Sequence, residues 1–110
     1  MTDKDRQELK AELMKTGFWD AAAGDPTAED AAATELYYEM ERQLREGVYL
    51  NFAYDQDALH QELRIRRGDF LYALPEGDDR CEAICLAALV LPEFLRRCPE
   101  YAASESLAMA

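Results

Sequence analysis

The sequence predicts a small α+β domain with elements in the order α-α-β-β-β-α, in which about three antiparallel strands carry helices on one face. Two patterns predict this class. Apolar residues recur at helical spacing before residue 47 and again after residue 79, whereas residues 48–54 and 70–74 read as strands. The length of 110 residues favours a single domain. We expect that domain to span residues 1–103 and residues 104–110 to form a loose C-terminal tail.

The first helix is expected to begin at Thr2 or Asp3 and to end near Lys15, with Gly17 as its stop. Thr2 and Asp5 have the spacing of a capping box. The apolar stripe of this helix is narrow, which predicts peripheral packing; it consists of Leu9, Leu13 and Met14.

Phe18 and Trp19 follow in a loop. Such an aromatic pair can pack onto the core or serve as an exposed anchor for a partner, because Trp is frequent among binding hot spots. Large aromatic side chains are usually well buried, so the core is the favoured interpretation.

The second helix is the most clearly patterned element. Asp25 and Pro26 resemble an N-cap followed by proline at the first helical position, and Gly47 follows the last periodic residue. The pattern predicts a helix from Asp25 to about Glu46. Its apolar positions fall within an arc of about 100°, namely Ala33, Leu36, Tyr37, Met40 and Leu44. The far side carries Glu35, Glu39 and Glu46, next to Tyr38.

Residues 48–54 alternate as a strand, with Val48, Leu50, Phe52 and Tyr54 expected to face the core. Residues 55–57 read as a turn. Residues 59–66 fit either a strand, with Leu59, Leu63 and Ile65 on one face, or a short helical turn capped by Asp57. Residues 70–74 form the next predicted strand, and Arg67-Gly68 suits a tight hairpin because glycine adopts positive φ easily.

The last helix is predicted to begin at Asp79, with Glu82 in the capping-box position. From Ala83 to Leu91 it is apolar on every side, which is typical of a buried central helix. Pro92 is expected to kink or restart the helix, and two further core residues follow it, Phe94 and Leu95.

The composition excludes several classes. The longest apolar run is half the length of a membrane span, and the N-terminus is polar and charged, so neither a membrane helix nor a secretory leader is expected. Three cysteines, an odd number, give no disulfide framework and favour a reducing cytoplasm. Net negative charge disfavours direct binding of nucleic acid or anionic membrane.

No sequence motif indicates a particular enzymatic reaction. Four residues could in principle bind zinc, but their spacing matches no zinc finger or ribbon and buried structural thiols are the favoured interpretation; they are His60, Cys81, Cys85 and Cys98. Acid pairs at 55/57 and 78/79 read as caps and turn residues, and no glycine-rich phosphate loop accompanies them. We therefore expect no metal, no cofactor and no enzymatic activity. Residues 67–69 have the sequence Arg-Gly-Asp, which is an integrin-binding motif, but we interpret them as part of a hairpin turn.

Negative charge is concentrated in the middle of the chain. The protein carries 23 acidic and 12 basic residues, a net charge of -11. Between Asp20 and Glu62 there are eleven acidic and two basic residues, so this segment alone contributes -9. A field of one sign over one region selects partners of opposite charge. The alternative is a solvated face that keeps the protein soluble, although such a face would normally mix both signs.

We therefore expect an acidic inhibitor that mimics nucleic acid and blocks a cationic nucleic-acid-binding site of a larger protein. The expected contact residues are Asp30, Glu35, Tyr38, Glu39, Glu41 and Glu46. In size and charge, though in no motif, the chain resembles the small proteins that phages use against CRISPR and other host defences. An immunity protein or antitoxin against a basic toxin is an alternative. A homodimer or homo-oligomeric adaptor is another, formed through the 83–91 helix or through the basic residues Arg64, Arg66 and Arg67.

Overall fold

A computed structural model describes residues 2–20, 24–55 and 60–103 of the chain. Within these ranges the helices are α1 (Asp3–Thr16), α2 (Asp30–Arg42) and α3 (Arg80–Arg97), followed by a 3-10 turn at Pro99–Tyr101. The strands β1 (Val48–Asp55), β2 (His60–Arg67) and β3 (Phe70–Ala73) form one antiparallel sheet in the order β1-β2-β3. The predicted class and element order are confirmed. The expected tail at 104–110 lies outside the described residues.

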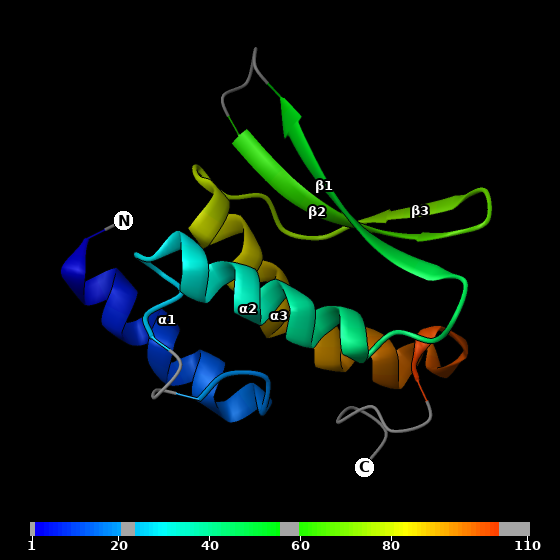
Figure 1. Cartoon of the computed structure of the whole chain (residues 1–110), viewed down its shortest axis with the longest axis horizontal. Coiled ribbons are helices and arrows are strands. Elements are labelled where there is room, and N and C mark those ends of the chain that lie inside the picture. The colour runs from blue at the N-terminus through cyan, green and yellow to red at the C-terminus, as the bar shows by residue number, and fades with distance from the viewer. Residues whose placement is uncertain (1, 21–23, 56–59, 104–110) are drawn as a thin grey trace.

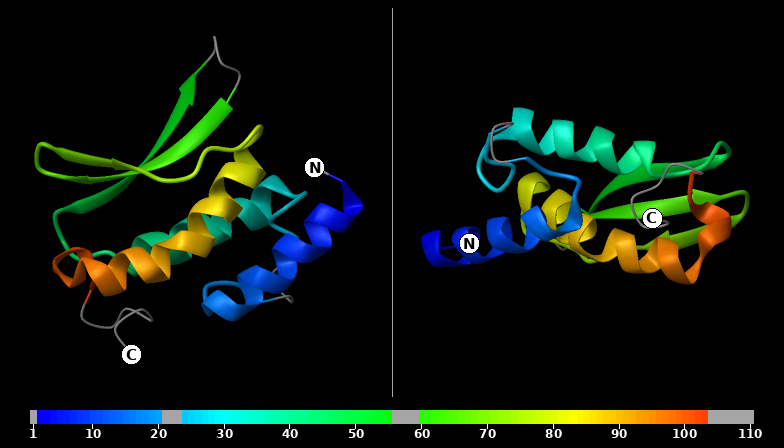
Figure 2. Two further views of the ribbon diagram at one scale, coloured as in Figure 1. Left: turned by 180° about the vertical axis from the view of Figure 1, so that it is seen from behind. Right: turned by 90° about the horizontal axis from the view of Figure 1, so that it is seen from below.

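The helices gather on one face of the sheet, and α1 packs against α3 on the side away from the strands (Figure 1; Figure 2). Helices α2 and α3 lie side by side and run in the same direction (Figure 1). Arg80 at the start of α3 bonds Asp30 at the start of α2, and Leu44 beyond the end of α2 bridges to Ala102 beyond the end of α3. The two helix N-termini therefore share one end of the molecule.

Helix α3 forms the centre of the core, as its all-apolar sequence predicts. Its inward side chains are fully buried against α1, α2 and β2. Asp79 caps its start by accepting a hydrogen bond from the Glu82 amide. Pro92 does not restart the helix, which continues to Arg97, because Leu91 and Leu95 hold both sides of the proline in the core. Because both leucines are buried, they cannot form part of an interface between two copies of the chain.

Helix α1 begins and ends as predicted. Thr2 and Asp5 form the expected capping box, and Gly17 ends the helix with φ of 80°. Phe18 is buried, and the indole of the partly buried Trp19 donates a 2.9 Å hydrogen bond to the Gly24 carbonyl. The aromatic pair therefore belongs to the core, and the linker after α1 is held by Trp19.

Helix α2 is shorter than predicted at both ends. Residues 25–28 form a turn instead of the first helical turn, and the helix begins at Asp30 with Glu29 as its N-cap. At the other end the chain leaves the helix after Arg42, because the segment that follows bonds to the C-terminal segment: the Arg45 amide donates to the Tyr101 carbonyl. Glu46 consequently lies in the turn before β1 and is not on the helix.

The ambiguous segment after residue 59 is a strand, since β2 buries Leu63 and Ile65 completely. Val48 and Leu50 of β1 face the core as expected. Phe52 lies on the same face, opposite the buried Leu63, but 38% of it is exposed, because the far part of the β1–β2 hairpin projects beyond the helices (Figure 1). The Tyr54 side chain, Leu59 and the predicted turn at 56–57 lie outside the described residues.

Candidate functional site

The outer face of α2 carries a row of three exposed side chains. Glu35, Tyr38 and Glu41 follow one another at intervals of three residues, so they are neighbours on the helix surface. Tyr38 is 51% exposed and both glutamates are exposed. The opposite face of α2 fills the core with Leu36 and Met40. We call this row the α2 ridge.

The ridge keeps its negative charge, whereas two acidic residues beside it are paired. Glu39 forms an ion pair with Arg42, and the Asp30 carboxylate lies 3.7 Å from the Arg80 guanidinium. Within the described ranges, neither Glu35 nor Glu41 takes part in an ion pair. The exposed anionic site of α2 is therefore narrower than predicted.

The predicted contact residues thus fall into three groups. The structure brings Glu35, Tyr38 and Glu41 together in the ridge. Asp30 and Glu39 lie on the same helix but in ion pairs. Glu46 lies apart, in the turn that follows the helix, because α2 ends at Arg42.

Tyr37 links the helix that carries the ridge to the sheet. Its place in the apolar arc did not indicate this role. Its hydroxyl donates a 2.5 Å hydrogen bond to the Leu50 carbonyl of β1. Its ring meets the ring of Tyr38 edge to face, with centroids 6.0 Å apart. Burial, and then the charge of Glu41, raise the pKa of Tyr37, so its hydroxyl remains a donor at neutral pH. The exposed Tyr38 therefore stands on a helix that is fixed to the sheet.

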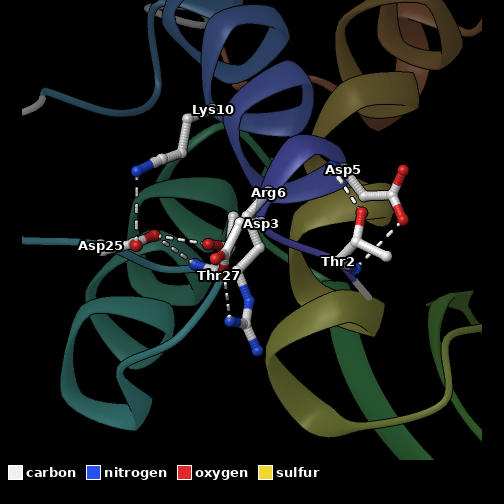
Figure 3. Close-up of polar contacts among 7 residues, drawn as sticks. All are labelled: Thr2, Asp3, Asp5, Arg6, Lys10, Asp25 and Thr27. Carbon is white, nitrogen blue, oxygen red and sulfur yellow. Dashed lines mark hydrogen bonds and ion pairs between the residues drawn. The ribbon is translucent and has the colours of Figure 1, made fainter.

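Other acidic residues of the N-terminal region are used within the fold. Asp25 accepts hydrogen bonds from the amide and hydroxyl of Thr27, and its carboxylate lies 3.5 Å from the Lys10 ammonium (Figure 3). Thr2 and Asp5 complete the cap of α1 in the same view (Figure 3). The carboxylates of Asp5 and Asp25 therefore stabilise a helix end and a turn, and neither belongs to the α2 ridge.

Two of the three cysteines belong to the core. Cys81 and Cys85 are buried, and burial is the main cause that raises their thiol pKa values, to about 11 and about 12 respectively. A hydrogen bond to Asp30 raises that of Cys81 further. Across the described residues there is no group of three His, Cys, Asp or Glu side chains that could hold a metal ion. At neutral pH these two thiols are protonated core side chains.

A second surface was missed by the sequence reasoning. A groove of about 740 Å³ runs between the β3 side of the sheet and α3. Its apolar lining includes Tyr72, Leu74 and Pro75 on one side and Leu89, Val90 and Phe94 on the other. The run Phe70-Leu71-Tyr72, in a strand only four residues long, was the signal that could have indicated it.

No protein-family model matches the chain, and no match was found among curated proteins or among solved structures. In the part of the chain that the structure describes, no helix has both the length and the apolar character needed to cross a membrane.

Proposed function

We propose that the protein is a non-enzymatic, acidic inhibitor that occupies a cationic nucleic-acid-binding site of a larger protein. The observation that supports this function is the α2 ridge, where two exposed carboxylates outside any described ion pair flank an exposed tyrosine. The core contacts of α2 are made by its opposite face, so folding does not require this arrangement. An aromatic side chain between charges is a frequent composition of binding hot spots.

The spacing of the ridge suits a site built for a nucleic-acid strand. At a rise of 1.5 Å per residue, the carboxylates of Glu35 and Glu41 are separated by about 9 Å along the helix axis. Phosphates of one DNA strand follow one another at about 3.4 Å of helix axis, so this distance spans two to three phosphates of a strand. Tyr38 would take the place of a base, because grooves for single strands combine cationic residues with aromatic stacking surfaces.

The field of the wider segment supports the same function. The segment from Asp20 to Glu62 carries a net charge of -9, and complementary fields accelerate association between proteins. The three cysteines are free thiols, which is typical of a reducing compartment. The proposal therefore places the inhibitor in the cytoplasm.

The test is capture of a partner by the immobilised protein from an extract of its native host. The test variants are Glu35→Gln/Glu41→Gln and Tyr38→Ala. The matched control is Glu8→Gln/Glu100→Gln, which removes two exposed charges outside α2 and changes the net charge equally.

We expect the wild type and the control to capture a DNA- or RNA-binding protein that elutes as salt is raised. The wild type should also inhibit nucleic-acid binding by that protein, and the ridge variants should lose affinity about tenfold or more. Capture that is unchanged by the ridge variants, or that persists when excess oligonucleotide is added, would show the proposed function to be wrong. A captured toxin that binds no nucleic acid would instead support the antitoxin alternative.

A further inference from the structure

Strand β3 is an edge of the sheet, and its outer backbone groups face solvent. On the side of β2 that faces β3, the Leu74 amide donates to the Leu63 carbonyl, and Gln61 exchanges two hydrogen bonds with Gly77. The odd-numbered residues of β2 therefore direct their backbone groups toward β3.

The alternation of antiparallel strands then fixes the direction of the β3 groups. Tyr72 is paired with Ile65, so its backbone groups point inward. Leu71 and Ala73 direct their N–H and C=O groups away from the sheet, where none of the residues that the structure describes forms a further strand.

The first half of the opposite edge, from Val48 to Leu50, is covered. On β1 the Leu50 carbonyl accepts the hydroxyl of Tyr37, and the Val48 amide donates to the Arg45 carbonyl. Exposed edge strands pair readily with other chains unless they are blocked in this way. Of the two edges, β3 is therefore the one whose outward-facing backbone groups are open along the whole strand.

The side chains around the open edge are apolar. Phe70, Leu71 and Tyr72 are consecutive and all are exposed, and the Tyr72 ring stacks on Phe94 of α3 with centroids 4.7 Å apart. The groove described above lies directly beside Tyr72. An exposed apolar patch next to unpaired strand groups is typical of an association surface.

We propose that β3 pairs antiparallel with β3 of a second copy of this chain, giving a two-fold homodimer with one continuous six-stranded sheet. A two-fold interface is formed by the same patch on both subunits. Leu71 and Ala73 both form backbone hydrogen bonds to the second copy only when Leu71 of each copy lies opposite Ala73 of the other. That register places Tyr72 at the two-fold axis, directly opposite Tyr72 of the second copy.

The charges at the two ends of β3 agree with this orientation. Arg66 and Arg67 lie at the hairpin end, where they outnumber Asp69. At the other end Glu62 and Glu76 outnumber Arg64, which forms an ion pair with Glu62. Antiparallel pairing brings the basic end of one copy beside the acidic end of the other. A peptide of unrelated sequence would lack this self-complementarity, which is why we assign a second copy as the occupant.

The dimer does not depend on the inhibitor function. Helix α2 lies toward the β1 edge of the sheet, where Tyr37 reaches Leu50, so pairing through β3 leaves both α2 ridges exposed. A monomer in solution would contradict the dimer and leave the inhibitor function untouched, and failure of partner capture would leave the dimer untouched.

The first experiment measures the oligomeric state by sedimentation velocity over a wide concentration range. Leu71→Lys places a charge on the open edge. Tyr49→Lys is the matched control, because Tyr49 and Leu71 lie on either side of Arg66 on the same face and are 61% and 54% exposed. We expect a wild-type dimer, at least tenfold weaker self-association for Leu71→Lys, and no change for the control. A wild type that remains monomeric, or a dimer weakened equally by both variants, would overturn the proposal.

The second experiment tests the register by cross-linking in a Cys98→Ser background, which removes the one cysteine that is not buried. Residues opposite each other in a non-hydrogen-bonded pair have Cα atoms about 4.5 Å apart, within reach of a disulfide. Tyr72→Cys is therefore expected to form a covalent dimer on mild oxidation, and Leu71→Cys is expected to remain a monomer under denaturing electrophoresis. No cross-link at 72, or an equally efficient cross-link at 71, would refute the two-fold register.

Discussion

Asp25 shows how one carboxylate of an acidic segment is used inside the fold. Its oxygen accepts from the Thr27 hydroxyl at 2.6 Å and from the Thr27 amide at 3.0 Å. Burial opposes ionisation of Asp25, but these hydrogen bonds and the nearby Lys10 outweigh it and hold the pKa below the ordinary value of 3.8. The ionised side chain therefore stabilises the turn that leads into α2.

We predict that Asp25→Ala lowers the free energy of unfolding at neutral pH by about 1–2 kcal/mol, because Thr27 loses its acceptor in a buried setting. Asp25→Asn keeps an acceptor oxygen and should lose less. Because the folded pKa is depressed, the stabilisation is complete above pH 3.8 and is lost as pH falls through the folded value. Urea unfolding at neutral pH and in strong acid should show the difference between wild type and Asp25→Ala shrinking in acid; a constant difference would argue against the charged turn.

The three thiols are predicted to differ in reactivity. Burial raises the pKa of Cys81 to about 11 and that of Cys85 to about 12, so few thiolates form at mildly alkaline pH. Cys98 is partly exposed. A thiol reagent should therefore modify one cysteine of the native protein rapidly and all three only in denaturant. The rapid phase should vanish in Cys98→Ser and persist in Cys81→Ser; rapid reaction of Cys85 in the native state would contradict the buried core position.

At the scale of elements, Gly77 allows the chain to pass closely over the start of α3. It pairs with Gln61, and a Cβ atom added there would lie 2.5 Å from the Ala83 nitrogen. We predict that Gly77→Ala lowers the free energy of unfolding by about 3 kcal/mol, at the upper end of overpacking costs. Gly68→Ala is the control, since its turn has open space around it and the positive φ alone costs about 1 kcal/mol. Thermal or urea unfolding measures both, and equal losses would contradict the close approach.

Local patterns predicted most of the elements correctly. The capping box at Thr2, the N-cap at Asp79 and the apolar run 83–91 depend on neighbours in sequence, and each is found as expected. The C-terminal end of α2 was not predictable in this way. It is determined by contacts with a distant segment, because the chain after Arg42 leaves the helix to bond residues near Tyr101. The partial exposure of Phe52 was not predictable for a similar reason, since only the tertiary arrangement shows that the hairpin extends past the helices.

The candidate site was predicted in part. Helical spacing correctly put Tyr38 beside exposed acids, but it could not show that Arg80, fifty residues away, lies next to Asp30. The open edge at β3 was also inaccessible to sequence reasoning, because strand order decides which strand has a free side.

At the scale of the whole molecule, α2 and α3 run in parallel, so acidic residues gather at one end. Asp30, Asp79 and Glu82 lie in the first turns or caps of these helices, whereas Arg42, Arg96 and Arg97 lie in the last turns. This order complements both helix dipoles. The local arrangement is favourable, and the net charge of -11 is nevertheless repulsive overall.

Salt is therefore predicted to stabilise the protein. Screening of like charges should raise the melting temperature by several degrees, which corresponds to about 1 kcal/mol for a domain of this size. Glu35→Gln/Glu41→Gln should melt higher than wild type at low salt and gain less from added salt. Calorimetry at low and moderate ionic strength measures both; a melting temperature that falls as salt rises would mean that the internal ion pairs outweigh the net repulsion.

Trp19 gives the molecule a built-in optical reporter. It is the chain's one tryptophan, and its indole is fixed to the Gly24 carbonyl in the linker between the first two helices. Its emission spectrum consequently tracks how α1 and that linker sit on the rest of the protein, whereas far-ultraviolet circular dichroism averages over every helix and strand. If the peripheral helix detaches before the remainder unfolds, fluorescence will change at a lower denaturant concentration than ellipticity, and the gap between the two curves will measure the cooperativity of the fold without any added dye.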